Sequence, residues 1–199
     1  MSPLPVSNQP ADSSSRAVPA GIWHVDSSHS KLQFSVRHLM VSKVRGHFGS
    51  FAGTVTTGSD PLDATVEGCL DVSSIDTGDV ARDDHLRSKD FFDVDRWPHM
   101  RLAGRIVATT PQGYLLRADM TIRDATRTVA LDVMLDPLRY DQDATPRLCA
   151  QATATVSRKD FGLQWNATIE AGGVLVADQV ELLLTVEALL TRDSRAATD

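Results

Sequence analysis

The sequence has few features of disulfide-rich, membrane-spanning or nucleic-acid-binding proteins. Its 199 residues include only two cysteines, Cys69 and Cys149, which are too few for a disulfide scaffold. It contains no run of about 18 consecutive apolar residues, which excludes a membrane-spanning helix. Its formal net charge is −6, whereas a nucleic-acid partner would require a basic face. We therefore expect one acidic globular domain, because a chain of this length buries a sizeable core.

Motifs for catalysis, metal binding and export are also missing. No HExxH, GxSxG or phosphate-binding GxxxxGK[ST] is present, and no Cys/His pair has the spacing of a zinc site. We predict a protein without enzymatic activity, cofactor or metal ion. A metal-dependent enzyme that uses the histidines, such as His38 with His85, stays open as an alternative. No basic start precedes a hydrophobic region at the N-terminus, so we expect a cytoplasmic protein with free thiols.

What the sequence does contain is alternation of apolar and polar residues, the pattern of half-buried β-strands. Eight segments show it, and a ninth short one is possible at 21–25: residues 31–40, 44–56, 64–72, 100–106, 114–122, 129–135, 148–156 and 180–186. In the second segment the parity switches near Gly49-Ser50, which indicates a bulge or a sharp bend. Short turns between the segments favour antiparallel neighbours. We predict an all-β fold, an eight-stranded antiparallel lipocalin-like barrel, over residues 21–190, with disordered tails at 1–20 and 191–199.

Residues 76–98 lack alternation and predict one short helix between strands. Thr77 or Asp79 is suited to cap its N-terminus, and the adjacent Asp83-Asp84 pair is interpreted as a solvated face. Phe91, Phe92 and Trp97 are expected to dock into or over a barrel end. Arg82, His85 and Arg87 lie near Asp84, and two interpretations stay open: ordinary surface salt bridges, or a polar mouth that orients a ligand head group.

An eight-stranded barrel is either filled by side chains or holds one small ligand. The inward rows contain many small residues, including Gly68, Gly104, Ala150 and Ala154, which favours an elongated apolar cavity over tight packing. His38 shares the parity of an apolar row, which is more typical of a core histidine than of a metal ligand. The predicted ligand-binding residues are Phe34, Val36, His38, Met40, Leu70, Phe91, Leu102, Ile106, Ala118, Met120, Ala152, Trp165 and Leu182.

Five blocks of the sequence resemble the YceI-like family of lipocalin-like, polyisoprenoid-binding proteins. They are WHVDSSHSKLQFSVRHLMVSKVRGHF at 23–48, SSIDTGDVARDDHLRSKDFFDVDRWP at 73–98, MTIRDATRTVALDV at 120–133, SRKDFGLQWN at 157–166 and AGGVLVADQVELLLTVEA at 171–188. The resemblance implies the same barrel, an amphipathic ligand such as a polyprenyl chain with a quinone or phosphate head, and a homodimer. It implies no catalytic residues, and it suggests that Asp26, His29, Arg82, Asp83, His85 and Ser88 hold the fold together.

The function predicted from these observations is non-catalytic binding of an amphipathic lipid, a polyisoprenoid or an isoprenoid quinone, in the barrel. Each buried CH₂ group contributes about 0.8 kcal/mol, so several isoprene units bind without a specific polar contact. The remaining alternative is a stress-response or redox-response module with a filled barrel. In that case Cys69 and Cys149, which fall on the outward parity, would be its reactive groups.

Overall fold

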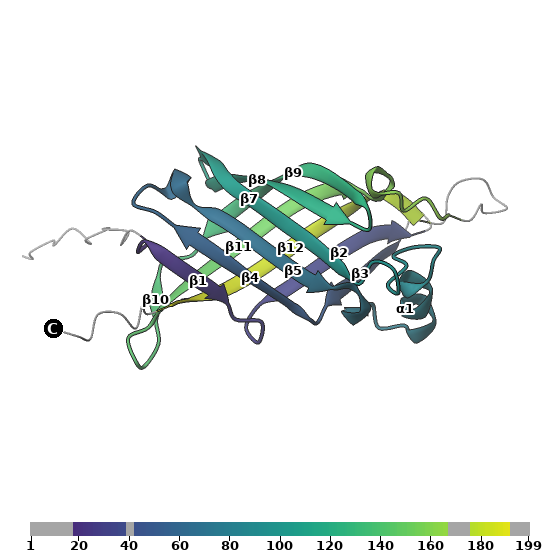
Figure 1. Cartoon of the computed structure of the whole chain (residues 1–199), viewed down its shortest axis with the longest axis horizontal. Helices are drawn as coiled ribbons and strands as arrows, with labels where there is room; N and C mark the ends of the chain where they lie inside the picture. Colours follow the sequence, from purple (N-terminus) through teal and green to yellow (C-terminus); the bar gives the residue numbers. More distant parts are fainter. Residues whose placement is uncertain (1–17, 39–41, 167–175, 192–199) are drawn as a thin grey trace, which may run out of the picture.

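The computed structural model describes residues 18–38, 42–166 and 176–191. They form a long barrel with one α-helix at one end (Figure 1). The strands are β1 (Gly21–Val25), β2 (Lys31–His38), β3 (Ser42–Phe48), β4 (Phe51–Thr57), β5 (Thr65–Asp71), β6 (Ile75–Asp76), β7 (His99–Thr110), β8 (Gly113–Ile122), β9 (Ala125–Leu135), β10 (Arg139–Tyr140), β11 (Pro146–Ser157) and β12 (Val176–Leu190). The helices are α1 (Val80–Arg87) and the 3₁₀ turns η1 (Pro61–Asp63), η2 (Val72–Ser74) and η3 (Arg158–Phe161).

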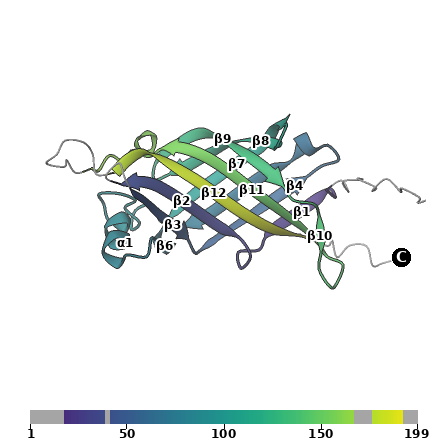
Figure 2. The ribbon, with the colours of Figure 1, turned by 180° about the vertical axis from the view of Figure 1, so that it is seen from behind.

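Eight of these strands close into a ring of antiparallel pairs. The order around the ring is β11-β9-β8-β7-β5-β4-β1-β12, and the pairing of β12 with β11 closes it. Along its other edge β12 pairs with β1 near its C-terminal end and with β2 nearer its start, as Figure 2 shows from behind. The predicted all-β, eight-stranded barrel with one short helix is confirmed.

The predicted strand at 44–56 divides at the parity switch. β3 pairs with β2 and β4 pairs with β1, so Gly49-Ser50 marks the point where the chain changes partner. A Cβ at Gly46 in β3 would lie 2.4 Å from the Phe34 ring and 2.8 Å from the Thr77 methyl group, so a larger residue there would force these side chains to shift. The alternation therefore located the strand correctly and the switch located its break.

Between β1 and β2 a tight turn keeps the chain against β12. The Asp26 carboxylate accepts hydrogen bonds from the Ser28 backbone N–H at 3.0 Å and the Ser28 hydroxyl at 2.5 Å, and His29 Nδ1 lies 2.8 Å from it. The Ser30 hydroxyl then donates to the Glu187 carbonyl and accepts from the Glu187 N–H. Because the hydrogen bonds from Ser28 and His29 to the Asp26 carboxylate favour its charged form, the pKa of Asp26 falls to about 2.

Helix α1 is capped by Asp79, whose carboxylate accepts from the Arg82 N–H at 3.1 Å. The interpretation of Asp83 as part of a solvated face is wrong: its side chain is buried and accepts from the Thr77 N–H and hydroxyl, at 3.0 and 2.5 Å. A carboxylate taken out of water needs such donors, and the segment before the helix supplies them.

The arginines of α1 also make structural contacts. Arg82 Nε donates to the Thr77 hydroxyl, and Arg87 donates to the carbonyls of Ser73 and Ile75 as well as to Asp84. These contacts tie the helix to η2 and β6. They engage the predicted mixed-charge cluster within the fold.

Most of the two predicted tails lies outside the described residues. Of the first segment, Val18 packs beside the buried Trp23, and the Pro19 carbonyl accepts a hydrogen bond from the Thr57 hydroxyl at 2.7 Å. Of the second, only Thr191 is described, and its N–H donates to the Ile22 carbonyl. The chain is thus anchored to the barrel a few residues before β1.

Replacing Asp26 with Asn tests the turn. We expect the free energy of unfolding to fall by about 1–2 kcal/mol near pH 7, because the charged acceptor is lost. A lowered folded-state pKa stabilises above the unfolded value of 3.8 and loses that contribution as pH falls through about 2. The difference between the two proteins, measured by urea unfolding, should therefore shrink as the pH is lowered from 5 towards 2. Asp124→Asn in the exposed β8–β9 turn is the control, and an equal loss there would contradict the prediction.

Candidate functional site

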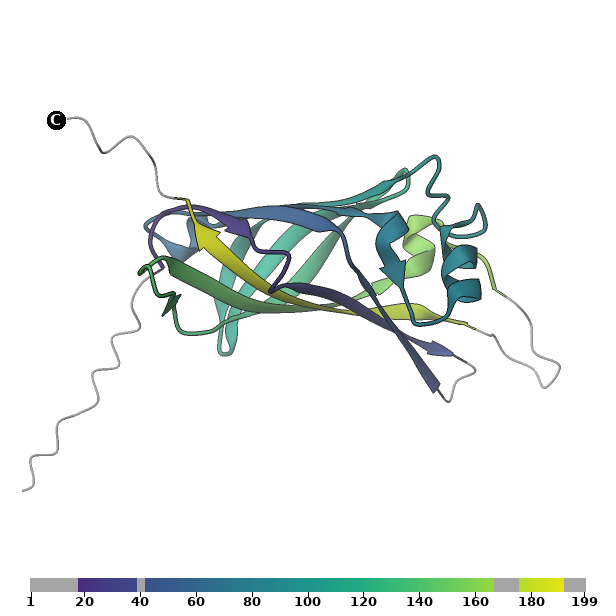
Figure 3. The same cartoon turned by 90° about the horizontal axis from the view of Figure 1, so that it is seen from below.

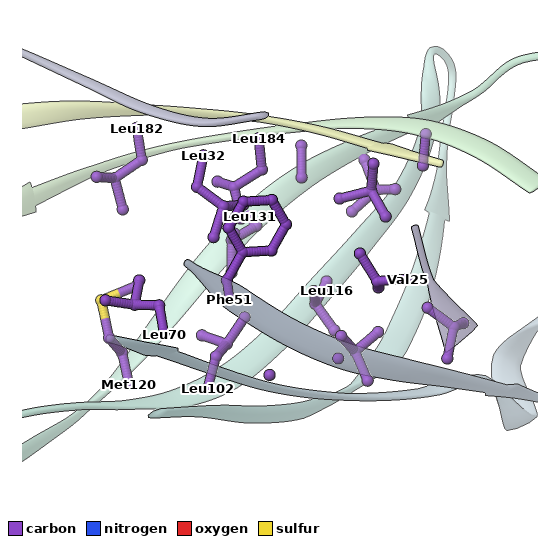
Figure 4. A pocket seen from close by; sticks show the side chains of 18 of the residues that line it. Val25, Leu32, Phe51, Leu70, Leu102, Leu116, Met120, Leu131, Leu182 and Leu184 are labelled. Atoms are coloured by element: carbon purple, nitrogen blue, oxygen red, sulfur yellow. The ribbon is translucent and has the colours of Figure 1, made fainter. Parts of the chain in front are cut away.

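The barrel encloses a cavity of about 970 Å³. Apolar side chains from strands on all sides point into it, as Figure 4 shows for Val25, Leu32, Phe51, Leu70 and Leu102 among others. The interior is therefore not filled by its own side chains, which disagrees with the filled-barrel alternative. The cavity has the shape and lining of a site for an apolar molecule.

Nine of the thirteen predicted ligand-binding residues line this cavity, and whether they contact a ligand stays a prediction. They are Phe34, Val36, Leu70, Phe91, Leu102, Ile106, Met120, Ala152 and Leu182. Sequence reasoning missed other lining residues, including Leu32, Phe51, Leu116, Leu131 and Leu184. The same alternation carries the signal for them, because each shares the inward parity of its strand.

The other predicted residues do not line the cavity, and Met40 lies outside the described residues. Ala118 points inward but is buried in the wall, so close to β7 that a Cβ at Gly104 would lie 2.4 Å from it. His38 is half-buried at the end of β2. Trp165 lies outside the lining, where its ring packs on His85 at 4.6 Å and Phe91 at 5.2 Å between ring centres.

The two ends of the cavity differ in chemistry. Towards α1 it is lined by apolar side chains, namely Leu86, Phe91, Phe92, Phe161 and Leu163. At the far end, where β7 turns into β8, polar side chains join the lining, namely Thr57, Ser59, Gln112, Tyr114 and Asp136. An amphipathic ligand would find its polar contacts at that far end.

Arg158 is the one buried cation on the cavity wall among the described residues. An arginine has five N–H donors, and all five are used here. Nε donates to the Ala177 carbonyl, Nη1 to those of Leu163 and Trp165, and Nη2 to the Val176 carbonyl and the Asp178 carboxylate. Burial lowers the pKa of Arg158. Its hydrogen bonds to backbone carbonyls join η3 to β12, so its role is structural.

The described residues do not group His38 and His85 with further metal-ligating side chains. The group they do contain is Asp26, His29 and Glu187 on the outer wall, whose ligand atoms lie within 4.8 Å of one another. Arg147 already hydrogen-bonds Glu187 and lies 3.8 Å from the Asp26 carboxylate. The guanidinium of Arg147 therefore supplies the positive charge that balances these two carboxylates.

Both cysteines are half-buried free thiols. Burial is the main cause that raises the pKa of Cys149, and the charge of Glu187 raises it further. A raised pKa lowers the thiolate fraction, and the thiolate is the reactive form. This environment is the opposite of that around a redox-sensing cysteine.

Alkylation with iodoacetamide tests the assignment of Cys149. In the folded protein at neutral pH we expect Cys149 to react several-fold more slowly than in the urea-unfolded chain, measured by mass spectrometry of peptides. Glu187→Gln should speed the reaction, because it removes a charge that disfavours the thiolate. Reaction in the folded protein at the unfolded rate would count against the prediction.

No helix among the described residues is long and apolar enough to cross a membrane. The model of the YceI-like domain family matches residues 23–188. Two relatives from Staphylococcus aureus are the UPF0312 proteins SAS2572 of strain MSSA476 and MW2606 of strain MW2. Each is 31% identical over 165 residues, which is 81% of this chain and 94% of the relative.

Solved structures show the same fold. BcnA from Burkholderia cenocepacia matches with a TM-score of 0.71 at 20% identity, over 82% of this chain and 98% of that one. The Campylobacter jejuni YCEI protein matches at 0.68 and 20%, over 78% and 90%. A polyisoprenoid binding domain from Saccharophagus degradans matches at 0.64 and 14%, over 87% and 100%. At these identities the likeness concerns the fold alone.

Proposed function

The chain belongs to the YceI-like family, and we propose that it binds a long-chain isoprenoid with an uncharged head, such as an isoprenoid quinone, without catalysing a reaction. The observation that carries the proposal is an apolar cavity along the barrel. Among the described residues its only buried cation is Arg158, whose N–H groups all donate to protein acceptors. A solved structure of the same fold is described as a polyisoprenoid binding domain, which supports the same class of ligand.

The apolar lining supports a long hydrocarbon chain. Side chains from both ends of the barrel line one continuous cavity, from Phe92 beside α1 to Tyr114 at the far end. Each CH₂ group moved from water into this lining contributes about 0.8 kcal/mol. A chain of several isoprene units is thus bound by the cavity wall alone.

The charges on the wall favour an uncharged head over a phosphate. Arg158 has no free donor, and Arg101 points outward because its neighbours Met100 and Leu102 face inward. The carboxylate of Asp136 borders the far end of the cavity and would repel an anion. A phosphate buried here without a cation would lose its hydration uncompensated.

The far end offers neutral hydrogen-bonding groups instead. Tyr114 and Gln112 are among the residues that line the cavity, and neither side chain makes a hydrogen bond with other described residues. They suit a carbonyl or hydroxyl on the ligand, since both can donate and both can accept. The Thr57 hydroxyl is already used by Trp23 and Pro19.

A competition experiment tests the choice of head group. We expect a polyprenol to displace a fluorescent lipid probe with at least about tenfold higher affinity than the polyprenyl phosphate of the same chain length, because burying an unpaired charge is costly. Equal affinity for the two, or preference for the phosphate, would contradict the proposed preference for an uncharged head.

Replacing Ala152 with Phe tests whether the ligand lies inside the barrel. The new ring would occupy the cavity, and we expect affinity for the polyprenol to fall at least about tenfold while the thermal unfolding midpoint changes little. Ala103→Phe is the matched control, since Ala103 is exposed on the outer wall opposite Glu67 and Asp119. Unchanged binding by the Ala152→Phe protein would sink the proposal.

The cytoplasmic location and the homodimer expected from the sequence also remain predictions. That the protein catalyses no reaction is also still a prediction, and it agrees with a family whose structures resemble binding proteins.

A further inference from the structure

One outer face of the barrel is basic although the protein as a whole is acidic. Phe34 and Val36 of β2 line the cavity, so the residues between and beside them point outward. The outward positions of β2 and β3 carry four exposed cations, which we call the basic face: Lys31, Arg37, Lys43 and Arg45. Figure 2 shows β3, β2, β12 and β11 side by side on this face.

Three carboxylates lie on or beside the basic face. Glu181 of β12 accepts two hydrogen bonds from Lys43 Nζ, at 2.7 and 2.9 Å, and one from Ser35. Two further carboxylates border the face: Asp76, paired with His47 at its base, and Asp132 on β9. The remaining cations, Lys31, Arg37 and Arg45, make no ion pair with any described residue. Arg37 interacts electrostatically with Glu181, so Lys31 and Arg45 are the least compensated positive charges on this wall of a protein whose net charge is −6.

A groove beside the basic face leads towards the lipid cavity. It has a volume of about 570 Å³ and runs from Arg45 across β2, β12 and β11 to β9. Under it the ladder between β9 and β11 is incomplete, since the pairing stops at Asp132↔Thr153. Phe34 and Leu182 line both the groove and the cavity. The wall between the two spaces is therefore thin on this side of the barrel.

Edge-to-edge pairing of β3 with a second copy of the chain is disfavoured at the basic face. β6 pairs only with His47 and Phe48 of β3, so the edge of β3 is open over residues 42–46. Antiparallel pairing of this edge with its own copy about Val44 would set Lys43 opposite Arg45. Like charges directly opposite each other destabilise a pair of strands. The face calls for a partner that is negatively charged.

We propose that the basic face docks on a lipid bilayer that contains anionic headgroups. Clustered lysines and arginines are attracted to such a surface, and the attraction weakens with salt. A bilayer is favoured over an acidic protein because the groove beside the cations leads towards a cavity suited to lipid. The biological purpose of docking, loading or release of the ligand, rests on the function proposed above. Docking itself does not.

Vesicle flotation tests the proposal on the full chain. We expect the protein to bind vesicles of phosphatidylcholine mixed with phosphatidylglycerol at low salt, and to be released by added salt. The double variant Arg37→Glu/Arg45→Glu should bind at least about tenfold more weakly. Both side chains are exposed and make no ion pair with a described residue, so circular dichroism should show an unchanged fold.

The control is Arg105→Glu/Arg117→Glu. These exposed arginines lie opposite each other on β7 and β8, on another wall, and the variant makes the same change in net charge. It should bind as the unchanged protein does. No binding to anionic vesicles, equal binding to vesicles of phosphatidylcholine alone, or an equal loss in the control would overturn the proposal. Polyprenol affinity of the Arg37→Glu/Arg45→Glu protein, measured without vesicles, separates this outcome from failure of the lipid-binding function.

Discussion

The structure depends on the pairing of β12 with three strands at once. One edge of β12 runs against β11 over eleven residue pairs and closes the ring, while the other edge is shared between β1 and β2. Sharing one edge requires the chain to leave β12 after Val25 and return at Lys31, and Asp26 and Ser30 hold that turn in place. The barrel is thereby longer than a single set of short strands would allow, as Figure 3 shows from below. A long apolar cavity follows from this length.

Within this long barrel the distribution of charge decides what can bind. The buried guanidinium of Arg158 donates to backbone carbonyls after η3 and at the start of β12. It therefore stabilises the fold and has no donor left for a ligand. Neutral polar groups gather at the end remote from α1, and cations gather on the outside of β2 and β3. An uncharged lipid inside and an anionic surface outside are the partners that this separation fits.

Much of the fold was predictable, because strands with one buried face must alternate. The alternation also gave eight of the nine predicted cavity residues, and Phe91 came from the segment without alternation. The failures have local physical causes. Ala118 has the right parity but packs into the wall beside Gly104, and parity alone does not reveal how close two strands approach. Asp83 has the sequence context of a surface carboxylate, and the donors from Thr77 that allow its burial are evident only in the structure. Trp165 packs on the rings of His85 and Phe91, and of these three residues only Phe91 lines the cavity. The role of Arg158 depends on carbonyls from two segments, the stretch after η3 and the start of β12, which no local pattern shows.

Native mass spectrometry of the freshly purified protein, followed by solvent extraction and fragmentation, tests the central claim most directly. The account predicts a stoichiometric adduct that solvent releases and whose fragments are those of an isoprenoid without phosphate. If the protein arrives empty, it should take up one molecule of added long-chain polyprenol. A mass that stays that of the bare chain after this addition, or a bound lipid with a phosphate head, would contradict the account.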